Sequence, residues 1–126
     1  MERRLIARNL AWIRVAVGAL LLLAPGLLGR LIVGRDASRP VGRMLLRGLA
    51  MRDLVLGVGL LRATELGHDD HDWLMFAAAS DAVDALATLV AFGQLPRRRR
   101  WLLLATAVGS TGAALVASTL EPMPTA

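Results

Sequence analysis

The sequence predicts an all-α fold, an integral membrane four-helix up-down bundle, and three observations support this prediction. The chain is 56% hydrophobic, with a mean hydropathy of +0.54. Its charged residues gather in short patches, and long runs of Leu, Ala, Val and Gly lie between the patches. Each run is close to the length of about 20 residues that a helix needs to cross the hydrocarbon of a bilayer.

Four segments are expected to cross the membrane, within a single domain that covers residues 1–120. The expected spans cover, approximately, residues 10–33, 44–61, 73–95 and 101–120. In the first span, Pro25 and Gly26 should kink or end the regular helix. Because the connectors are short, neighbouring helices must run antiparallel, which gives the up-down order. Residues 121–126 are expected to form a short polar tail.

Composition excludes several classes of function. The chain has no cysteine, so disulfides and thiolate metal sites are ruled out. All 15 basic residues are Arg, which is typical of a GC-rich genome such as an actinobacterial one. The net charge of +5 does not indicate a nucleic-acid partner, because no aromatic stacking platform accompanies the basic residues. Anionic lipid headgroups are the expected counter-charge, and no cofactor is expected because no cofactor-binding loop is found.

The distribution of arginine predicts that both termini lie outside the cell, since cytoplasmic loops are enriched in Lys and Arg. With this orientation seven arginines near the spans face the cytoplasm, namely Arg35, Arg39, Arg43 and Arg97–Arg100. Four lie outside, namely Arg3, Arg4, Arg8 and Arg62. The basic N-terminus favours the opposite orientation.

Six charged residues fall inside the expected spans. Placing an ionised side chain at the bilayer centre costs roughly 2.5 to 3.5 kcal/mol on insertion scales, so such residues persist where they face the bundle interior and find partners. Three are basic and three are acidic: Arg14, Arg47, Arg52, Asp53, Asp81 and Asp84. We therefore expect opposite charges to pair across the helices.

Helical spacing places these charges on faces lined by small residues. In the third span, Ala77, Asp81, Asp84 and Thr88 follow one another at steps of four, three and four, which puts both acids on one stripe. The other spans offer the stripes Ala7, Ala11, Arg14 and Gly18; Ala50, Asp53 and Gly57; Gly48, Arg52 and Gly59; and Ala105, Gly109, Gly112 and Val116. Each helix should therefore have a face on which backbones approach closely.

A buried network is the resulting hypothesis, in which two arginines neutralise three aspartates. The expected ligand-binding or proton-binding residues are Arg14, Arg52, Asp53, Asp81, Asp84 and Thr88. Arg47 lies nearer the end of its span, so its side chain is expected to reach the headgroups. An alternative stays open here: the ion pairs could fix only the register and assembly of the helices, without any binding site.

The leading functional interpretation is non-enzymatic. The network would bind a lipophilic or cationic small molecule, or the chain would act as an accessory subunit, in a homo-oligomer or a larger membrane complex. A second interpretation is a proton-coupled small-molecule transporter, because Asp81 and Asp84 are close enough in sequence to share a proton. A third is a membrane-embedded isomerase or cyclase in which the same two carboxyl groups are the catalytic acid and base.

Two charged segments at the ends of spans have simpler interpretations. Arg97–Arg100 are expected to contact anionic lipid headgroups and to anchor the topology. The stretch HDDHD holds His68 and His71, which are of metal-ligand type. Acids at this place also complement the positive end of the helix that comes next, so we expect a helix start and no metal.

Two stretches, RGLAMRDLVLGVGLL and AAASDAVDALATL, carry a resemblance. They resemble a group of short four-span bacterial membrane proteins of unknown function, which have an Arg-Asp pair followed by glycine in the second helix. Here these residues are Arg52, Asp53 and Gly57. The same group has an aspartate in the third helix, for which Asp81 or Asp84 is the match. The resemblance covers about the middle half of the chain and implies no particular activity.

Overall fold

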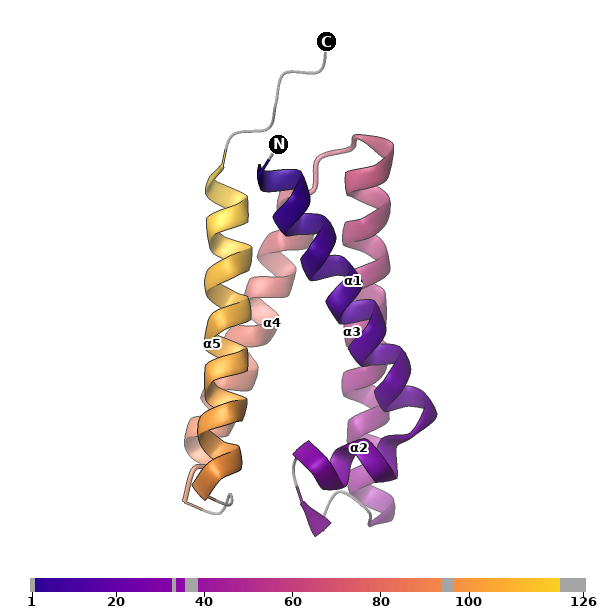
Figure 1. Cartoon of the computed structure of the whole chain (residues 1–126), viewed down its shortest axis with the longest axis vertical. Helices are drawn as coiled ribbons and strands as arrows, with labels where there is room; N and C mark the ends of the chain where they lie inside the picture. Colours follow the sequence, from indigo (N-terminus) through magenta and orange to yellow (C-terminus); the bar gives the residue numbers. More distant parts are fainter. Residues whose placement is uncertain (1, 33, 36–38, 94–96, 121–126) are drawn as a thin grey trace.

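The structure is a computed structural model, and it describes residues 2–32, 34–35, 39–93 and 97–120. Within these residues the chain is helical and contains no strand, which confirms the all-helical prediction. The helices are α1 (Glu2–Leu23), α2 (Pro25–Ile32), α3 (Pro40–Leu66), α4 (His71–Val90) and α5 (Arg97–Thr119). The four long helices run alternately in opposite directions, so the start of α1 and the end of α5 lie at the same end of the molecule (Figure 1). The predicted tail, residues 121–126, lies outside the described residues.

Three of the helices are long and apolar enough to cross a membrane. They cover Glu2–Leu23, His71–Val90 and Arg99–Thr119. α3 is longer, with 27 residues, but Arg47, Arg52 and Asp53 interrupt its apolar middle. Large apolar side chains are exposed on the outside of all four long helices, among them Trp12, Val58, Phe76 and Val108. The chain is therefore compatible with a membrane protein.

The first expected span, residues 10–33, is two helices in the structure. α1 begins at Glu2, about two turns before the expected start, and ends at Leu23. Pro25 has no N–H group to donate back along the helix, so a new helix starts there. The new helix, α2, packs on α1 and α3 and lies across the end of the molecule opposite the termini (Figure 1).

The closest approach between helices is that of α1 and α3. A Cβ atom on Gly57 would lie 2.9 Å from the carbonyl oxygen of Ala11, and one on Gly18 would lie 2.8 Å from that of Ala50. Any side chain at either position would therefore push the two backbones apart. These four residues belong to the small-residue stripes that the spacing predicted, and each is buried.

The buried apolar residues form two clusters at different heights. One lies toward the end that holds the termini and joins all four long helices through Ala7, Ala11, Leu60, Leu74 and Ala117. The other joins only α1, α2 and α3, and it is built around Leu21, Leu46 and Ala50. Among the described residues, none of α4 or α5 belongs to this second cluster. We call α1 with α3 the first helix pair and α4 with α5 the second.

The prediction that the small-residue stripe of the last span packs against another helix of the chain is wrong. Ala105, Gly109 and Gly112 are exposed, and no atom of another part of the chain lies within 4 Å of a Cβ built on either glycine. The buried side of α5 instead carries Ala114 and Ala117. Because α5 is apolar or small on every side, periodicity could not identify the face that packs against α4.

Candidate functional site

Arg14 lies at the centre of the predicted network of charges. Its side chain leaves α1, where it is buried, and its Nη1 donates a hydrogen bond of 3.0 Å to Oδ1 of Asp53 on α3. Its Nη2 donates to the carboxylate of Asp81 on α4, and more weakly to the backbone oxygen of Ala77 at 3.4 Å. One guanidinium therefore binds two carboxylates from two different helices.

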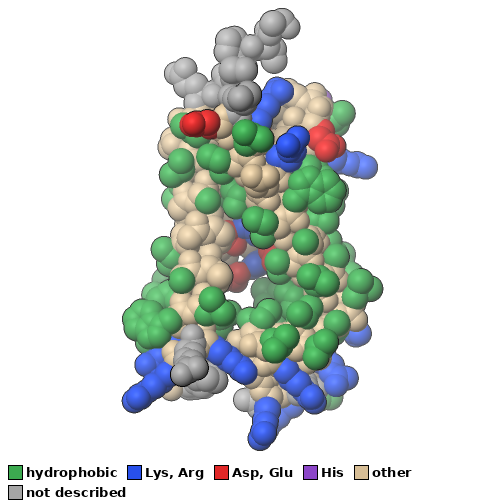
Figure 2. Space-filling view, in the orientation of Figure 1, with side chains coloured by type: hydrophobic (Ala, Val, Ile, Leu, Met, Phe, Trp, Pro, Cys, Tyr) green, Lys and Arg blue, Asp and Glu red, His purple; other side chains and the backbone are tan. Residues whose placement is uncertain are grey.

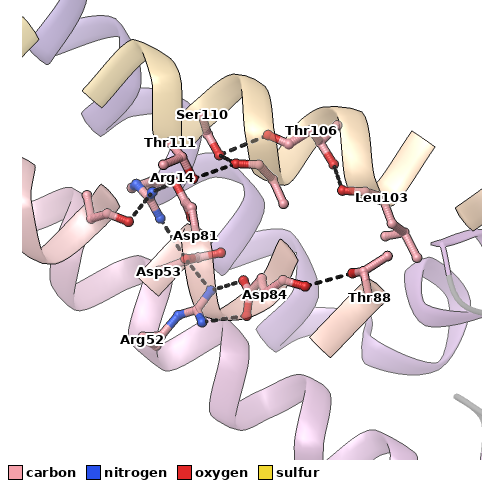
Figure 3. Close-up of polar contacts among 12 residues, drawn as sticks. Arg14, Arg52, Asp53, Asp81, Asp84, Thr88, Leu103, Thr106, Ser110 and Thr111 are labelled. Carbon is pink, nitrogen blue, oxygen red and sulfur yellow. Dashed lines mark hydrogen bonds and ion pairs between the residues drawn. The ribbon is translucent and has the colours of Figure 1, made fainter. Parts of the chain in front are cut away.

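Arg52 extends the network toward the second carboxylate of α4. Its Nη1 and Nη2 donate to the two carboxylate oxygens of Asp84 at 3.0 and 2.7 Å, the paired geometry that suits a planar guanidinium. Nη2 also lies 3.3 Å from Oδ1 of Asp53, so that carboxylate is shared by both arginines. Figure 3 shows the five side chains turned toward one another from three helices. We call these five residues, Arg14, Arg52, Asp53, Asp81 and Asp84, the charge network.

A second buried ion pair, which the sequence reasoning missed, lies near the termini. The Nη2 of Arg3 donates to the carboxylate of Asp70, and both side chains are buried. Its two residues are 67 positions apart, the same separation as Arg14 and Asp81. Eleven residues separate Arg3 from Arg14 and likewise Asp70 from Asp81, which is about three helical turns, so each helix presents both of its partners on one face.

The signal for Arg3 was present in the stripe on α1. Arg3, Ala7, Ala11, Arg14 and Gly18 follow at helical spacing, and all five are buried. Extending the stripe by one turn toward the N-terminus would have included the first arginine. The missed pair also changes the interpretation of the HDDHD segment, because the carboxylate of Asp70 binds an arginine of α1 and makes no cap on its own helix.

Charge divides unequally between the two helix pairs. The first pair supplies both guanidiniums of the network and one carboxylate, Asp53, while the second pair supplies two carboxylates, Asp81 and Asp84. Opposite net charges therefore face each other across the gap, and the network as a whole has one more carboxylate than guanidiniums. On α5, the hydroxyl of Ser110 donates to the backbone oxygen of Thr106 at 2.9 Å, one turn back along its own helix.

The network changes from buried to open along its length. The side chains of Arg14 and Asp81 are 9% and 8% exposed, whereas those of Arg52 and Asp84 are 29% and 37% exposed. Figure 2 shows a hollow between the two helix pairs on the face toward the viewer, in which acidic and basic side chains are visible. The Arg52–Asp84 pair is therefore the more accessible of the two.

The remaining expected site residues are not drawn into the network. Thr88 donates its hydroxyl hydrogen to the backbone oxygen of Asp84 at 2.7 Å, one turn back along its own helix. Arg47 is exposed, and its contact with headgroups stays a prediction. His68 and His71 are exposed, and among the described residues no group of three or more His, Cys, Asp or Glu could hold a metal ion.

The arginines at the start of α5 differ from one another in their surroundings. Arg97 is exposed, and the side chain of Arg98 lies outside the described part of the chain. Arg99 donates to the backbone oxygen of Arg30 at 2.9 Å. Arg100 lies over the ring of Phe92 at 4.4 Å, and that ring also meets Trp101 edge to face. Two of the arginines expected to contact headgroups, Arg99 and Arg100, therefore also contact other parts of the protein.

Comparison with known proteins gives no relative: no family model, no curated protein and no solved structure matches this chain.

Proposed function

We propose that the chain is a multi-pass protein of the cell membrane in which all four long helices, α3 included, cross the bilayer as an up-down bundle. The charges that interrupt α3 support this proposal, because Arg52 and Asp53 find partners on the neighbouring helices and need not face lipid. A cytoplasmic position for the end that carries α2 follows from its arginines. Arg30, at the end of α2, adds one more to that side.

The same network supports a proposal for function: the hollow binds a lipophilic molecule that carries a cationic group. The observation that carries this proposal is the surplus carboxylate, together with the partial exposure of Asp84. A cation placed beside Asp84 would balance the charge of the network, and the apolar walls would accept the rest of the molecule. Entry from the bilayer through the open face avoids the arginines at the end of the molecule.

Binding of tetraphenylphosphonium, a lipophilic cation, to the purified protein in detergent tests this proposal by equilibrium dialysis. We expect saturable binding that is roughly tenfold weaker in Asp84→Asn, the equivalent of about 1.4 kcal/mol. Asp72→Asn is the matched control, because Asp72 is an exposed acid in the first turn of the same helix. Absence of saturable binding, or equal weakening in both variants, would reject a cation site and leave the ion pairs with a purely structural role.

Proton-coupled transport is the second candidate, because a proton could balance the surplus carboxylate as well as a cation could. Flux of the same probe into proteoliposomes that depends on a pH gradient, and is lost in Asp84→Asn, would favour it over binding alone. The isomerase or cyclase alternative has less support from the geometry. Asp81 and Asp84 both accept hydrogen bonds from arginine, and each would have to leave its partner before donating a proton.

Association with a second copy or with a larger complex stays a prediction. The exposed small residues of α5, Ala105, Gly109 and Gly112, would allow the backbone of a neighbouring helix to come close. Chemical crosslinking in native membranes, compared between the parent chain and Gly109→Leu, would show whether this face is covered.

A further inference from the structure

A pocket of about 470 Å³ lies at the arginine-rich end, apart from the charge network. It is lined by Arg30, Gly34, Arg35 and Arg99. Arg30 belongs to α2, Gly34 and Arg35 come after that helix, and Arg99 belongs to the first turn of α5. The fold therefore brings three guanidinium groups from two distant parts of the sequence to one opening, and no carboxylate is among the described lining residues.

The pocket is held in shape by a contact between its two halves. Nη1 of Arg99 donates to the backbone oxygen of Arg30 at 2.9 Å, which ties the start of α5 to the end of α2. Gly34 has a φ of +115°, a conformation that side chains disfavour, and a Cβ there would lie 3.1 Å from the same Nη1. Glycine thus makes room for the guanidinium. The anchoring bond uses one of the five N–H groups that an arginine can donate.

Charge and position together indicate what this pocket binds. Arg30 and Arg99 bring like charges to one opening, and guanidinium geometry suits the oxygens of a phosphate group. Leu27 and Leu31, on α2 beside the pocket, are exposed, as expected for a helix end that lies where headgroups meet acyl chains.

We propose that Arg30 and Arg99, with Arg35 lining the same opening, form a binding site for the phosphate monoester group of an anionic lipid. The acyl chains of such a lipid would lie against α2. This site is independent of the ligand proposed for the hollow, because none of its residues belongs to the charge network.

Native mass spectrometry of the purified protein in a non-ionic detergent, titrated with dioctanoyl phosphatidic acid, tests the proposal. We expect one bound lipid and a dissociation constant that rises roughly tenfold in Arg99→Gln and in Arg30→Gln, the equivalent of about 1.4 kcal/mol each. Arg62→Gln, an exposed arginine at the other end of α3, has the same change in net charge and should bind as the parent chain does. If Arg99→Gln fails to fold, Arg30→Gln decides, because its backbone oxygen still accepts the bond from Arg99.

Two outcomes would overturn the proposal. Unchanged binding in Arg30→Gln, or equal weakening in Arg62→Gln, would mean that net charge and no particular site attracts the lipid. Inorganic phosphate and glycerol 3-phosphate are the second arm of the experiment. We expect neither to displace the lipid at equal concentration, and displacement would assign the pocket to a soluble phosphate compound instead.

Discussion

Where α1 packs against α3, a glycine on each helix meets the backbone of the other, whereas the polar contacts from α1 to α4 are made, among the described residues, by the side chains of Arg3 and Arg14. The first contact is apolar and leaves no space. The second joins helices whose backbones make little direct contact. The difference indicates that small residues build the first helix pair, while opposite charges dock the second pair onto it. Only a contact of the second kind keeps polar groups within reach of a ligand.

Loss of Arg14 should lower stability the most. It leaves the buried carboxylate of Asp81 without its guanidinium partner and leaves Asp53 with one partner. We expect Arg14→Met to lower the free energy of unfolding by roughly 3 to 5 kcal/mol. Unfolding in mixed micelles with increasing SDS, followed by far-UV circular dichroism, measures it. Arg8→Met on the same helix is the control, since Arg8 is exposed and should change stability little. Equal losses in the two variants would mean that the network does not hold the pairs together.

A larger side chain at Gly57 should weaken the contact between α1 and α3. The added methyl groups of Gly57→Val would collide with the backbone of α1, and we expect a loss of about 1 to 3 kcal/mol from overpacking. Gly109→Val in α5 is the matched change at a helical glycine with open surroundings, and the same unfolding assay should show almost no loss. A cost at Gly109 as large as that at Gly57 would mean that the close packing of α1 on α3 is not the cause of the loss.

Removal of Arg3 should cost less than removal of Arg14, since its single partner lies near the end of the helices and can regain water. For Arg3→Gln we expect a loss of about 1 to 2 kcal/mol, the typical cost of leaving a buried acceptor without its donor. The exposed neighbour in Arg4→Gln serves as the control for net charge. Hydrogen exchange should localise the effect to the start of α1 and the start of α4. Uniform protection in both variants would contradict a role in docking.

The outer ion pair should contribute least to stability. Arg52 and Asp84 are partly exposed, so we expect Asp84→Asn to change the free energy of unfolding by less than about 1 kcal/mol. The same substitution at Asp81 should cost distinctly more, because that carboxylate is buried beside Arg14. Thermal unfolding in detergent compares the two. If the order were reversed, the outer pair would be a structural element and a poor candidate for a ligand site.

Much of the candidate site could be predicted from the sequence because it depends on local spacing and on a strong energetic rule. Ionised groups within apolar segments must find partners, and helical periodicity placed Asp81 and Asp84 on one face of their helix. The partners could be named by type, but not by pairing. Which arginine binds which aspartate depends on the height at which helices α1, α3 and α4 cross, and that height comes from packing between helices.

Features without a periodic signal could not be predicted. The last span is apolar or small on all sides, so its packed face, with Ala114 and Ala117, had to come from the structure. The break at Pro25 was expected from the sequence, but the direction in which α2 then runs depends on its packing against α3, and the pocket at Arg30 and Arg99 depends on that direction. Long-range packing decides all three, and no local pattern in the sequence encodes it.

The coupling energy between Arg14 and Asp81 tests most directly whether charge docks the second helix pair onto the first. In a double-mutant cycle with Arg14→Met and Asp81→Leu, each single change leaves a charge without its partner, whereas the double change removes both. We predict that the double variant is more stable than the sum of the single losses by about 2 kcal/mol or more in the SDS unfolding assay. Additive losses would show that the two side chains do not meet across the helix pairs, and docking by charge would then be wrong.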